Sequence, residues 1–125
     1  MRLRRVVAAT LAICLMLPAA LLAHLAVVKS APARGEKVAK PPERIQVWFN
    51  QPPSERVSHL ELDGPAGKVA LEKVEVDRTD KSISARVPAS LEPGDYEVRW
   101  RTAGHDGHVI RGTFSFSVHS KASGR

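Results

Sequence analysis

The chain has 125 residues and a formal net charge of +6, and 43% of its residues are hydrophobic. Without Arg2, Arg4 and Arg5, which belong to an N-terminal leader, the charge falls to +3 over the remaining 102 residues. This mild charge, with no basic stripe interleaved with aromatic residues, argues against nucleic-acid binding, and the length allows one ordinary domain.

Residues 1–23 have the layout of a secretory signal peptide. A basic start precedes the apolar stretch 6–17, and Pro18 introduces small and apolar residues that end at Ala23. Cleavage after Ala23 would make His24 the first residue of the mature chain. The alternative is an uncleaved membrane anchor, but the apolar stretch is short for a membrane span and Pro18 interrupts it. We therefore expect export to a bacterial periplasm and a mature form that is not embedded in a membrane.

The mature chain has no sulfur-containing side chain, because Cys14, Met1 and Met16 all lie in the leader. It can form neither a disulfide nor a thiolate metal site. Copper(I) is a soft ion that prefers thiolate or thioether ligands, so a methionine-rich Cu(I) site is excluded.

After the leader, six runs alternate apolar and polar residues with a period of two, which is typical of strands with one buried face. In chain order the runs are 44–50, 57–63, 68–76, 82–87, 95–101 and 113–119. Six or seven short strands in about 100 residues predict an all-β domain, either a β-sandwich or a small Greek-key barrel. We assign this domain to residues 24–120 and expect a flexible tail over 121–125. The residues predicted for its core are Val47, Phe49, Val98, Trp100, Phe114 and Phe116.

The sequence Gly104-His-Asp-Gly-His108 lies between the last two runs and is a candidate metal-binding loop. Asp106 and His108 are two residues apart, so in an extended stretch their side chains point the same way. Imidazole nitrogen and carboxylate oxygen are suitable ligands for Cu(II) and for zinc. On its own the motif is weak, because Asp-Gly followed by a polar residue is also common in plain turns.

His24 strengthens the metal hypothesis. A mature N-terminal histidine offers its α-amine and its imidazole to one ion, and this chelate favours a metal that prefers nitrogen and tetragonal geometry. Copper(II) binds most tightly among the divalent first-row metals. We therefore predict one Cu(II) per chain, held by His24, Asp106 and His108. The alternative is that His24 merely marks the end of the leader and that the N-terminal segment is disordered.

The other histidines are weaker candidates. We expect His59 and His119 to be surface residues. His105 should point away from Asp106. An additional ligand is one alternative, but we expect His105 to support the site from outside the ligands or to take no part. The sequence contains no recognisable Ser/His/Asp set, phosphate loop or helical zinc motif, so we do not expect an enzyme.

The mature chain resembles the CopC family of periplasmic copper-binding proteins along its whole length. The segments that carry the resemblance are His24 after the leader, Ser30-Ala-Pro-Ala-Arg-Gly35, Pro42-Glu-Arg-Ile-Gln-Val-Trp-Phe49, Gly94-Asp-Tyr-Glu-Val-Arg-Trp100, Asp106-Gly-His108 and Gly112-Thr-Phe-Ser-Phe-Ser-Val118. The resemblance implies a cupredoxin-like or immunoglobulin-like Greek-key fold of about seven strands. It also implies Cu(II) bound at His24, Asp106 and His108, in a carrier or reservoir that serves copper tolerance or delivery to an inner-membrane copper transport protein.

Two departures from the family pattern flank the candidate site. Asn50-Gln51 stands where many relatives carry an acidic residue, and Gly104-His105 adds an imidazole before the Asp-Gly-His motif. Two other functions remain open: a metal-free immunoglobulin-like interaction module, and a copper-dependent oxidative enzyme that uses an N-terminal histidine chelate. The small size and the few aromatic residues disfavour the enzyme, which would need a flat aromatic substrate face.

Overall fold

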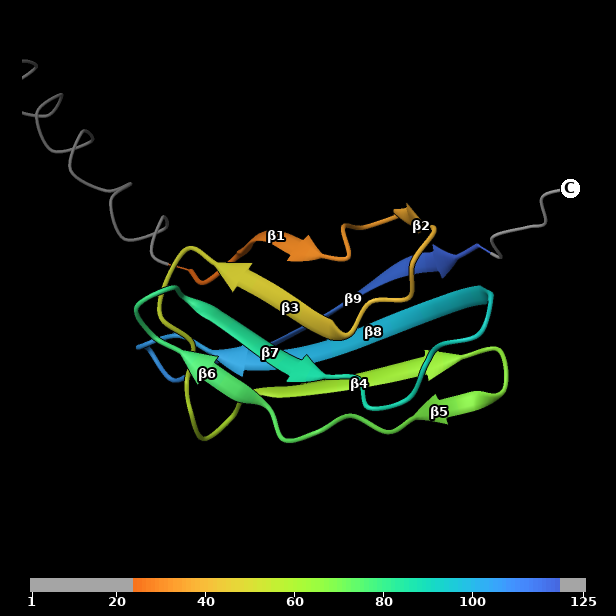
Figure 1. Cartoon of the computed structure of the whole chain (residues 1–125). Coiled ribbons are helices and arrows are strands. Elements are labelled where there is room, and N and C mark those ends of the chain that lie inside the picture. The colour runs from red at the N-terminus through yellow and green to blue at the C-terminus, as the bar shows by residue number, and fades with distance from the viewer. Residues whose placement is uncertain (1–23, 120–125) are drawn as a thin grey trace, which may run out of the picture.

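The computed structural model describes residues 24–119, which form two β-sheets packed face to face (Figure 1). The expected all-β Greek-key sandwich is confirmed. The proposed signal peptide (1–23) and flexible tail (121–125) lie outside the described residues. The described part of the chain contains no helix long and apolar enough to cross a membrane.

Nine strands make up the two sheets. The four-stranded sheet has the order β1-β3-β7-β6, and the five-stranded sheet has the order β2-β9-β8-β4-β5. All neighbouring strands pair antiparallel except β2 with β9. The bounds are Val27–Ala31 (β1), Lys37–Val38 (β2), Arg44–Phe49 (β3), His59–Gly64 (β4), Gly67–Val69 (β5), Glu75–Asp77 (β6), Ser82–Arg86 (β7), Gly94–Ala103 (β8) and Val109–Val118 (β9).

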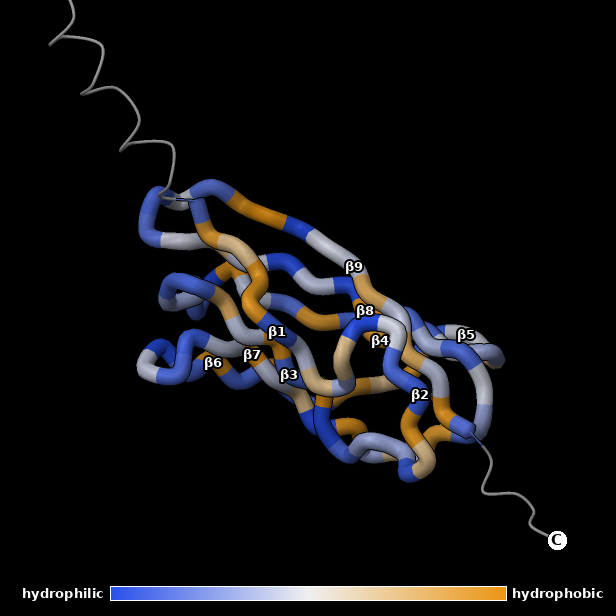
Figure 2. Tube along the Cα trace, turned by 90° about the horizontal axis from the view of Figure 1, so that it is seen from above, coloured by the Kyte–Doolittle hydropathy of each residue, from blue (hydrophilic) through white to orange (hydrophobic). Residues whose placement is uncertain are grey.

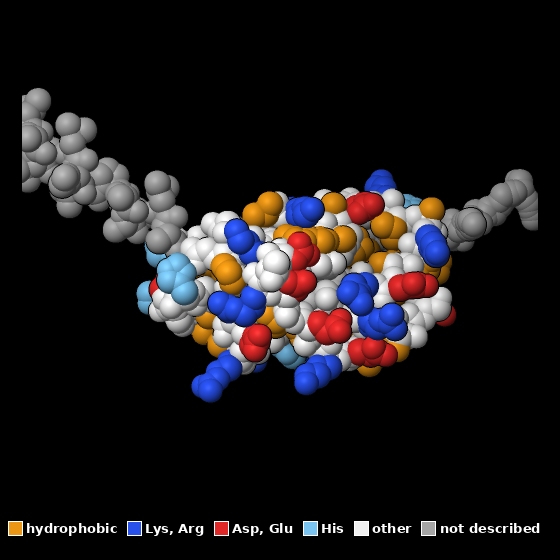
Figure 3. Space-filling model, turned by 60° about the vertical axis from the view of Figure 1, so that its left-hand side comes forward, with side chains coloured by type: hydrophobic (Ala, Val, Ile, Leu, Met, Phe, Trp, Pro, Cys, Tyr) orange, Lys and Arg blue, Asp and Glu red, His pale blue; other side chains and the backbone are white. Residues whose placement is uncertain are grey.

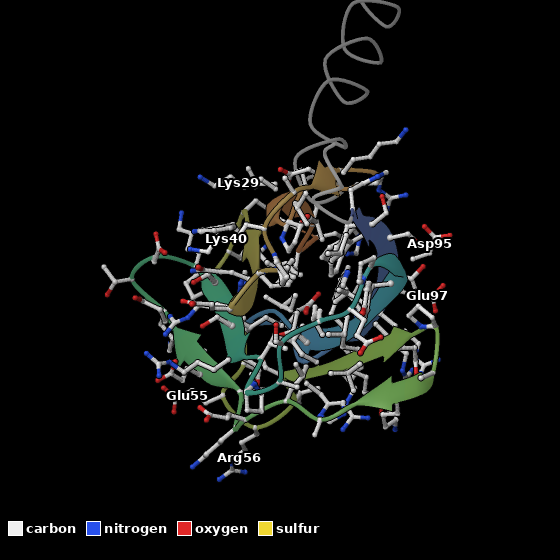
Figure 4. All side chains as sticks on the ribbon, turned by 45° about the vertical axis from the view of Figure 1, so that its right-hand side comes forward. Lys29, Lys40, Glu55, Arg56, Asp95 and Glu97 are labelled. Atoms are coloured by element: carbon white, nitrogen blue, oxygen red, sulfur yellow. The ribbon has the colours of Figure 1, made fainter. Side chains whose placement is uncertain are left out.

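The core lies between the sheets and follows from the period-two pattern, because successive side chains of a strand point to opposite faces. Along β8, Tyr96, Val98 and Trp100 are buried, whereas Asp95 and Glu97 point away from the sandwich (Figure 4). Figure 2 shows the corresponding alternation of hydrophobic and hydrophilic positions along the chain. The core residues predicted from the sequence are all buried: Val47, Phe49, Val98, Trp100, Phe114 and Phe116.

Two aromatic pairs stabilise this core. Phe49 of β3 meets Trp100 of β8 edge to face, with ring centroids 5.3 Å apart, and this contact joins the two sheets. Tyr96 stacks on Phe116 of the neighbouring strand at 5.4 Å, and its hydroxyl donates to the Glu92 carbonyl oxygen at 2.6 Å. Such ring pairs add roughly 0.5–1.5 kcal/mol beyond the area they bury.

The structure differs from the sequence prediction at the run 68–76. This run is not one strand: β5 ends at Val69 in one sheet, and β6 begins at Glu75 in the other. The alternation changes phase between Leu71 and Val74 because the chain crosses here from one sheet edge to the other. Both of these side chains still pack against the core.

The short strands β1 and β2 were absent from the prediction and raise the number of strands above the expected seven. The residues of β1 are mostly exposed, and a bulge between Val27 and Lys29 breaks its alternation. Backbone pairing with β3 holds it in place. The alternation of apolar and polar residues in the sequence therefore does not predict this strand.

The long hairpin β8–β9 determines where the candidate loop lies. Ten consecutive residue pairs join the two strands, from Gly94 with Val118 to Ala103 with Val109. The connection 104–108 therefore lies at the end of the sandwich where β3 ends and β1 begins, whereas His119 follows β9 at the opposite end (Figure 1).

Candidate metal centre

The loop between β8 and β9 brings Asp106 and His108 together. The Gly107 backbone N–H donates to the Gly104 carbonyl oxygen at 3.1 Å, which closes a four-residue turn. Gly107 has a φ of +80°, which glycine adopts without the steric penalty of a side chain. Asp106 Oδ1 accepts the backbone N–H of His108 at 3.1 Å, and Asp106 Oδ2 lies 3.5 Å from Nδ1 of the His108 ring. The two side chains thus meet across a tight turn rather than along an extended stretch.

Both members of this pair can be reached from solvent. The side chain of His108 is 79% exposed and that of Asp106 is 38% exposed. Figure 3 shows histidine side chains gathered at this end of the molecule. An ion could therefore approach the two donor groups without any disturbance of the apolar core.

Asn50, the residue after β3, fixes the backbone that follows His24. Its Nδ2 donates to the His24 carbonyl oxygen at 3.2 Å, and its Oδ1 accepts the N–H of Ala26 at 2.8 Å. Its own N–H donates to the Ala26 carbonyl oxygen at 3.0 Å. These three hydrogen bonds bracket Leu25, which is buried. We call this arrangement of Asn50, His24 and Ala26 the Asn50 clamp.

The N-terminal segment and the loop meet at Gly104. A Cβ atom on Gly104 would lie 2.8 Å from Gln51 Oε1, 3.4 Å from Leu25 Cβ and 3.7 Å from Asp106 Oδ1. The residue after His24 therefore packs against the same glycine as the Asp106 carboxylate. A side chain at position 104 would require the end of the Gln51 side chain to shift, whereas Leu25 and Asp106 would lie at ordinary contact distances.

The structure does not gather all three predicted ligands into one group. Within residues 24–119, no three His, Cys, Asp or Glu side chains are arranged to hold an ion. Asp106 and His108 form a pair, and His24 is exposed on the neighbouring segment. In the full chain the His24 nitrogen belongs to a peptide bond and has no basic lone pair, so the proposed chelate requires cleavage. The ligand set His24, Asp106 and His108 stays a prediction.

The remaining histidines lie as surface residues. His59 Nε2 is 3.4 Å from Glu61 Oε1, and the His59 side chain is 45% exposed. His119 is exposed, with Nε2 3.3 Å from the Ser117 hydroxyl. His105 is exposed within the loop itself.

Asn50 is the site residue that the sequence reasoning missed. From the sequence alone, Asn50 marks only the absence of the acidic residue that many relatives carry near this position. A side-chain amide carries both a donor and an acceptor, however, and can therefore bond to two backbone groups at once. A lone asparagine directly after an apolar strand was the only available signal.

The donor groups at the loop are of types that Cu(II) accepts. Imidazole nitrogen and carboxylate oxygen are both present at the loop, and copper(II) accepts nitrogen and oxygen ligands in tetragonal arrangements. The described chain contains no sulfur donor that would favour copper(I).

Comparison with known proteins places the chain among copper-related proteins of one family. Residues 27–119 match the sequence model of the CopC domain. The chain is 27% identical over 110 residues to the copper transport protein CutJ of Bacillus subtilis (strain 168), covering 86% of this chain and 20% of CutJ. It therefore spans about a fifth of the length of that relative. It is 28% identical over 98 residues to the protein YobA of Escherichia coli (strain K12), covering 77% of this chain and 79% of YobA.

Two solved structures share the fold. CopC from Methylosinus trichosporium OB3b superposes with a TM-score of 0.72 at 22% identity, covering 82% of this chain and 100% of that one. PcoC, a methionine-rich copper resistance protein from Escherichia coli, superposes with a TM-score of 0.69 at 31% identity, covering 78% of this chain and 100% of that one.

Proposed function

The chain belongs to the CopC family, and from this membership we propose that it is a non-enzymatic periplasmic protein that binds one Cu(II) per chain. In this proposal the protein stores or carries copper. It serves copper tolerance or delivers copper to an inner-membrane copper transport protein.

The observation that carries the proposal is the Asp106–His108 pair beside the segment that follows His24. Removal of a signal peptide after Ala23 would free the His24 amine. Amine, two imidazoles and one carboxylate would then offer three nitrogens and one oxygen, a set that suits Cu(II). The Asn50 clamp supports this scheme because it anchors the backbone next to that amine.

The absence of sulfur supports Cu(II) over Cu(I). PcoC is described as methionine-rich. Here both methionines and the single cysteine fall within residues 1–23. The mature chain would therefore lack the soft ligands that copper(I) prefers.

The position of the loop supports a carrier rather than a structural metal site. The loop 104–108 is exposed or half-exposed, and the core between the sheets is built from apolar side chains that do not include Asp106 or His108. Copper could thus bind and leave without the cost of unfolding the sandwich.

The test is a copper titration of the metal-free mature chain, residues 24–125, against competing chelators for each oxidation state. We expect one tightly bound Cu(II) per chain and weak binding of Cu(I). Tighter binding of Cu(I) would contradict the ligand set. Failure to bind stoichiometric Cu(II) would favour a metal-free interaction module, and copper-dependent turnover of a substrate would favour an enzyme.

A further inference from the structure

The first half of β9 is an open sheet edge. Strand β9 pairs with β8 over its full length, but β2 reaches it only at Ser117 and Val118. The segment before β2 adds two contacts: Arg34 Nη2 donates to the Thr113 carbonyl oxygen at 3.1 Å, and the Gly35 N–H donates to the Ser115 carbonyl oxygen at 2.7 Å. Among residues 24–119, no strand pairs with β9 on this side before Ser117.

Backbone groups of Val109 and Arg111 face this open edge. In an antiparallel pair, alternate residues direct their N–H and C=O groups to the same side of the strand. Thr113, Ser115 and Ser117 use the side away from β8, as their contacts with the segment 34–37 show. The register is unbroken, so Arg111 and Val109 direct their backbone groups to that side as well.

A hollow lined by both apolar and basic residues accompanies the edge at residues 112–114 of β9. It has a volume of about 400 Å³ and lies between β1 and β9, with Val27, Val28 and Trp100 among its lining residues. Figure 2 views these two strands from above. Val27, Val28 and Val109 are 42%, 63% and 46% exposed, and they are the large hydrophobic residues of the described chain that remain exposed.

Two arginines without an acidic partner lie near this edge, Arg111 on β9 itself and Arg101 on the neighbouring strand β8. Arg101 and Arg111 stand directly opposite each other on β8 and β9, where like charges destabilise a sheet. Arg99, by contrast, is neutralised by Glu61 and Asp63, with Nη2–oxygen distances of 2.9 and 2.8 Å. Neither Arg101 nor Arg111 forms an ion pair with a carboxylate within the described residues.

We propose that the open edge of β9 binds an extended, acidic segment of a partner protein as an additional strand. The backbone groups of Val109 and Arg111 would supply the hydrogen bonds, and the exposed valines would supply apolar contact. Arg101 and Arg111 would attract and align carboxylates. A second copy of this chain fits less well, because two equally basic edges repel each other.

This edge begins one residue after His108, so the partner segment would lie beside the 104–108 loop. The proposal does not depend on copper binding, and its test uses the metal-free mature chain. Failure of one proposal can therefore be told apart from failure of the other.

The test measures binding of an acetylated peptide that alternates glutamate and valine, with a lysine–valine peptide as the charge-reversed probe. Backbone amide chemical shifts of the mature chain report the position of binding. We expect the acidic peptide to shift the amides of 109–113 most strongly and the basic peptide to leave them unchanged. An acidic peptide with N-methyl groups along one edge should bind weakly, because it cannot complete the hydrogen-bond ladder.

Two charge reversals form a matched pair of variants. Arg111→Glu should weaken binding of the acidic peptide by about tenfold. Arg86→Glu is the control, because Arg86 is exposed and also stands opposite another arginine, Arg44, but in the other sheet. Each reversal places opposite charges across a strand pair, so both variants should fold, and circular dichroism checks this.

The proposal would be overturned by equal binding of the acidic and basic peptides, equal effects of the two reversals, shifts centred on another strand, or no shift at millimolar peptide. Self-association of the chain through the 109–113 edge would replace the acidic partner with a second copy and would also overturn it.

Discussion

The side-chain amide of Asn50 donates to the carbonyl oxygen of His24 at 3.2 Å, across 26 positions of the sequence. The oxygen of the same amide accepts the N–H of Ala26, so one neutral side chain bonds to the backbone on both sides of Leu25. A carboxylate could accept from Ala26 but could not donate to His24. The clamp therefore depends on asparagine at this position.

We predict that Asn50→Ala lowers the Cu(II) affinity of the mature chain by about tenfold without unfolding it. Without the clamp, the segment around His24 must be ordered during binding, and ordering one residue costs roughly 1–2 kcal/mol. Chelator competition measures the affinity. Gln46→Ala is the control, because it also removes a side-chain amide, one that lies within β3 and donates to the Ser82 hydroxyl at 3.0 Å. Equal affinities for the two variants and the unchanged chain would exclude a positioning role for Asn50.

We predict that the exported chain begins at His24 and that blocking its amine weakens Cu(II) binding while the fold survives. Acetylation of His24, or one extra residue before it, removes one nitrogen ligand and breaks the chelate ring. Intact mass identifies the native start, and copper titration with thermal unfolding compares free and blocked forms. A native start at Leu25 or later would refute the ligand set, and unchanged affinity of the blocked form would show that the amine is not a ligand.

We predict that His108→Ala weakens Cu(II) binding strongly, by about a hundredfold or more, whereas His119→Ala has little effect. His108 Nδ1 lies 3.5 Å from Asp106 Oδ2, whereas His119 contacts Ser117. Asp106→Asn separates two roles of the carboxylate, because the amide oxygen can still accept the His108 N–H but offers no charge to a metal. Equal losses in the two histidine variants would place the metal elsewhere.

A prediction on pH dependence concerns the outer face of the five-stranded sheet. The pKa of Glu61 falls from 4.5 to about 2, mainly because of the hydrogen bond from Arg99, then because of His59 and the charge of Lys68. The folded pKa lies below the unfolded one, so this carboxylate stabilises the fold above pH 4.5. That contribution is lost as the pH falls from 4.5 to about 2.

Glu61→Gln should therefore lower the thermal midpoint near neutral pH and flatten its decline between pH 4.5 and about 2. High salt should reduce the difference in thermal midpoint between the two proteins, because Glu61 and its charged neighbours are accessible to solvent and their interactions are screened. Thermal unfolding followed by circular dichroism across this pH range is the measurement. Parallel curves for the two proteins would show that the ion pairs of Glu61 do not contribute.

We predict that Gly112→Ala destabilises the domain by about 1–3 kcal/mol, which corresponds to a fall in the thermal midpoint of roughly 5–20 °C. A Cβ at Gly112 would lie 2.4 Å from Cζ2 of Trp100, so the indole ring must shift, and its packing against Phe49 changes with it. Ser115→Ala, at an exposed position of the same strand, should change the midpoint by much less. Equal stability of both variants would mean that the Trp100 ring can shift without loss of stability.

The sequence predicted those strands that have one face buried. Period-two alternation identified β3, β4, β8 and β9 because burial alternates along them. It also identified β7, whose sequence alternates although four of its five residues are buried. It could not identify β1, which is held by backbone pairing and has little buried surface. The prediction of a single strand over 68–76 was wrong for a related reason. The apolar residues of this run cover the edges of two different sheets but still alternate along the sequence.

At the candidate site, local spacing predicted the approach of Asp106 and His108, which one tight turn determines. The Asn50 clamp was not predictable in this way. Its hydrogen bonds depend on how β1 aligns with β3, a register that only the complete sheet defines.

Strand β9 runs for ten residues from the loop to the far end of the sandwich, a rise of about 30 Å at 3.3 Å per residue. The two covalent ends of the domain therefore differ as attachment points. A tag, a linker or a solid support that is attached after His119 would lie far from Asp106 and His108. Anything joined before His24 occupies the nitrogen on which the proposed chelate depends. Immobilised or fused forms of this protein should accordingly be built through the carboxyl end.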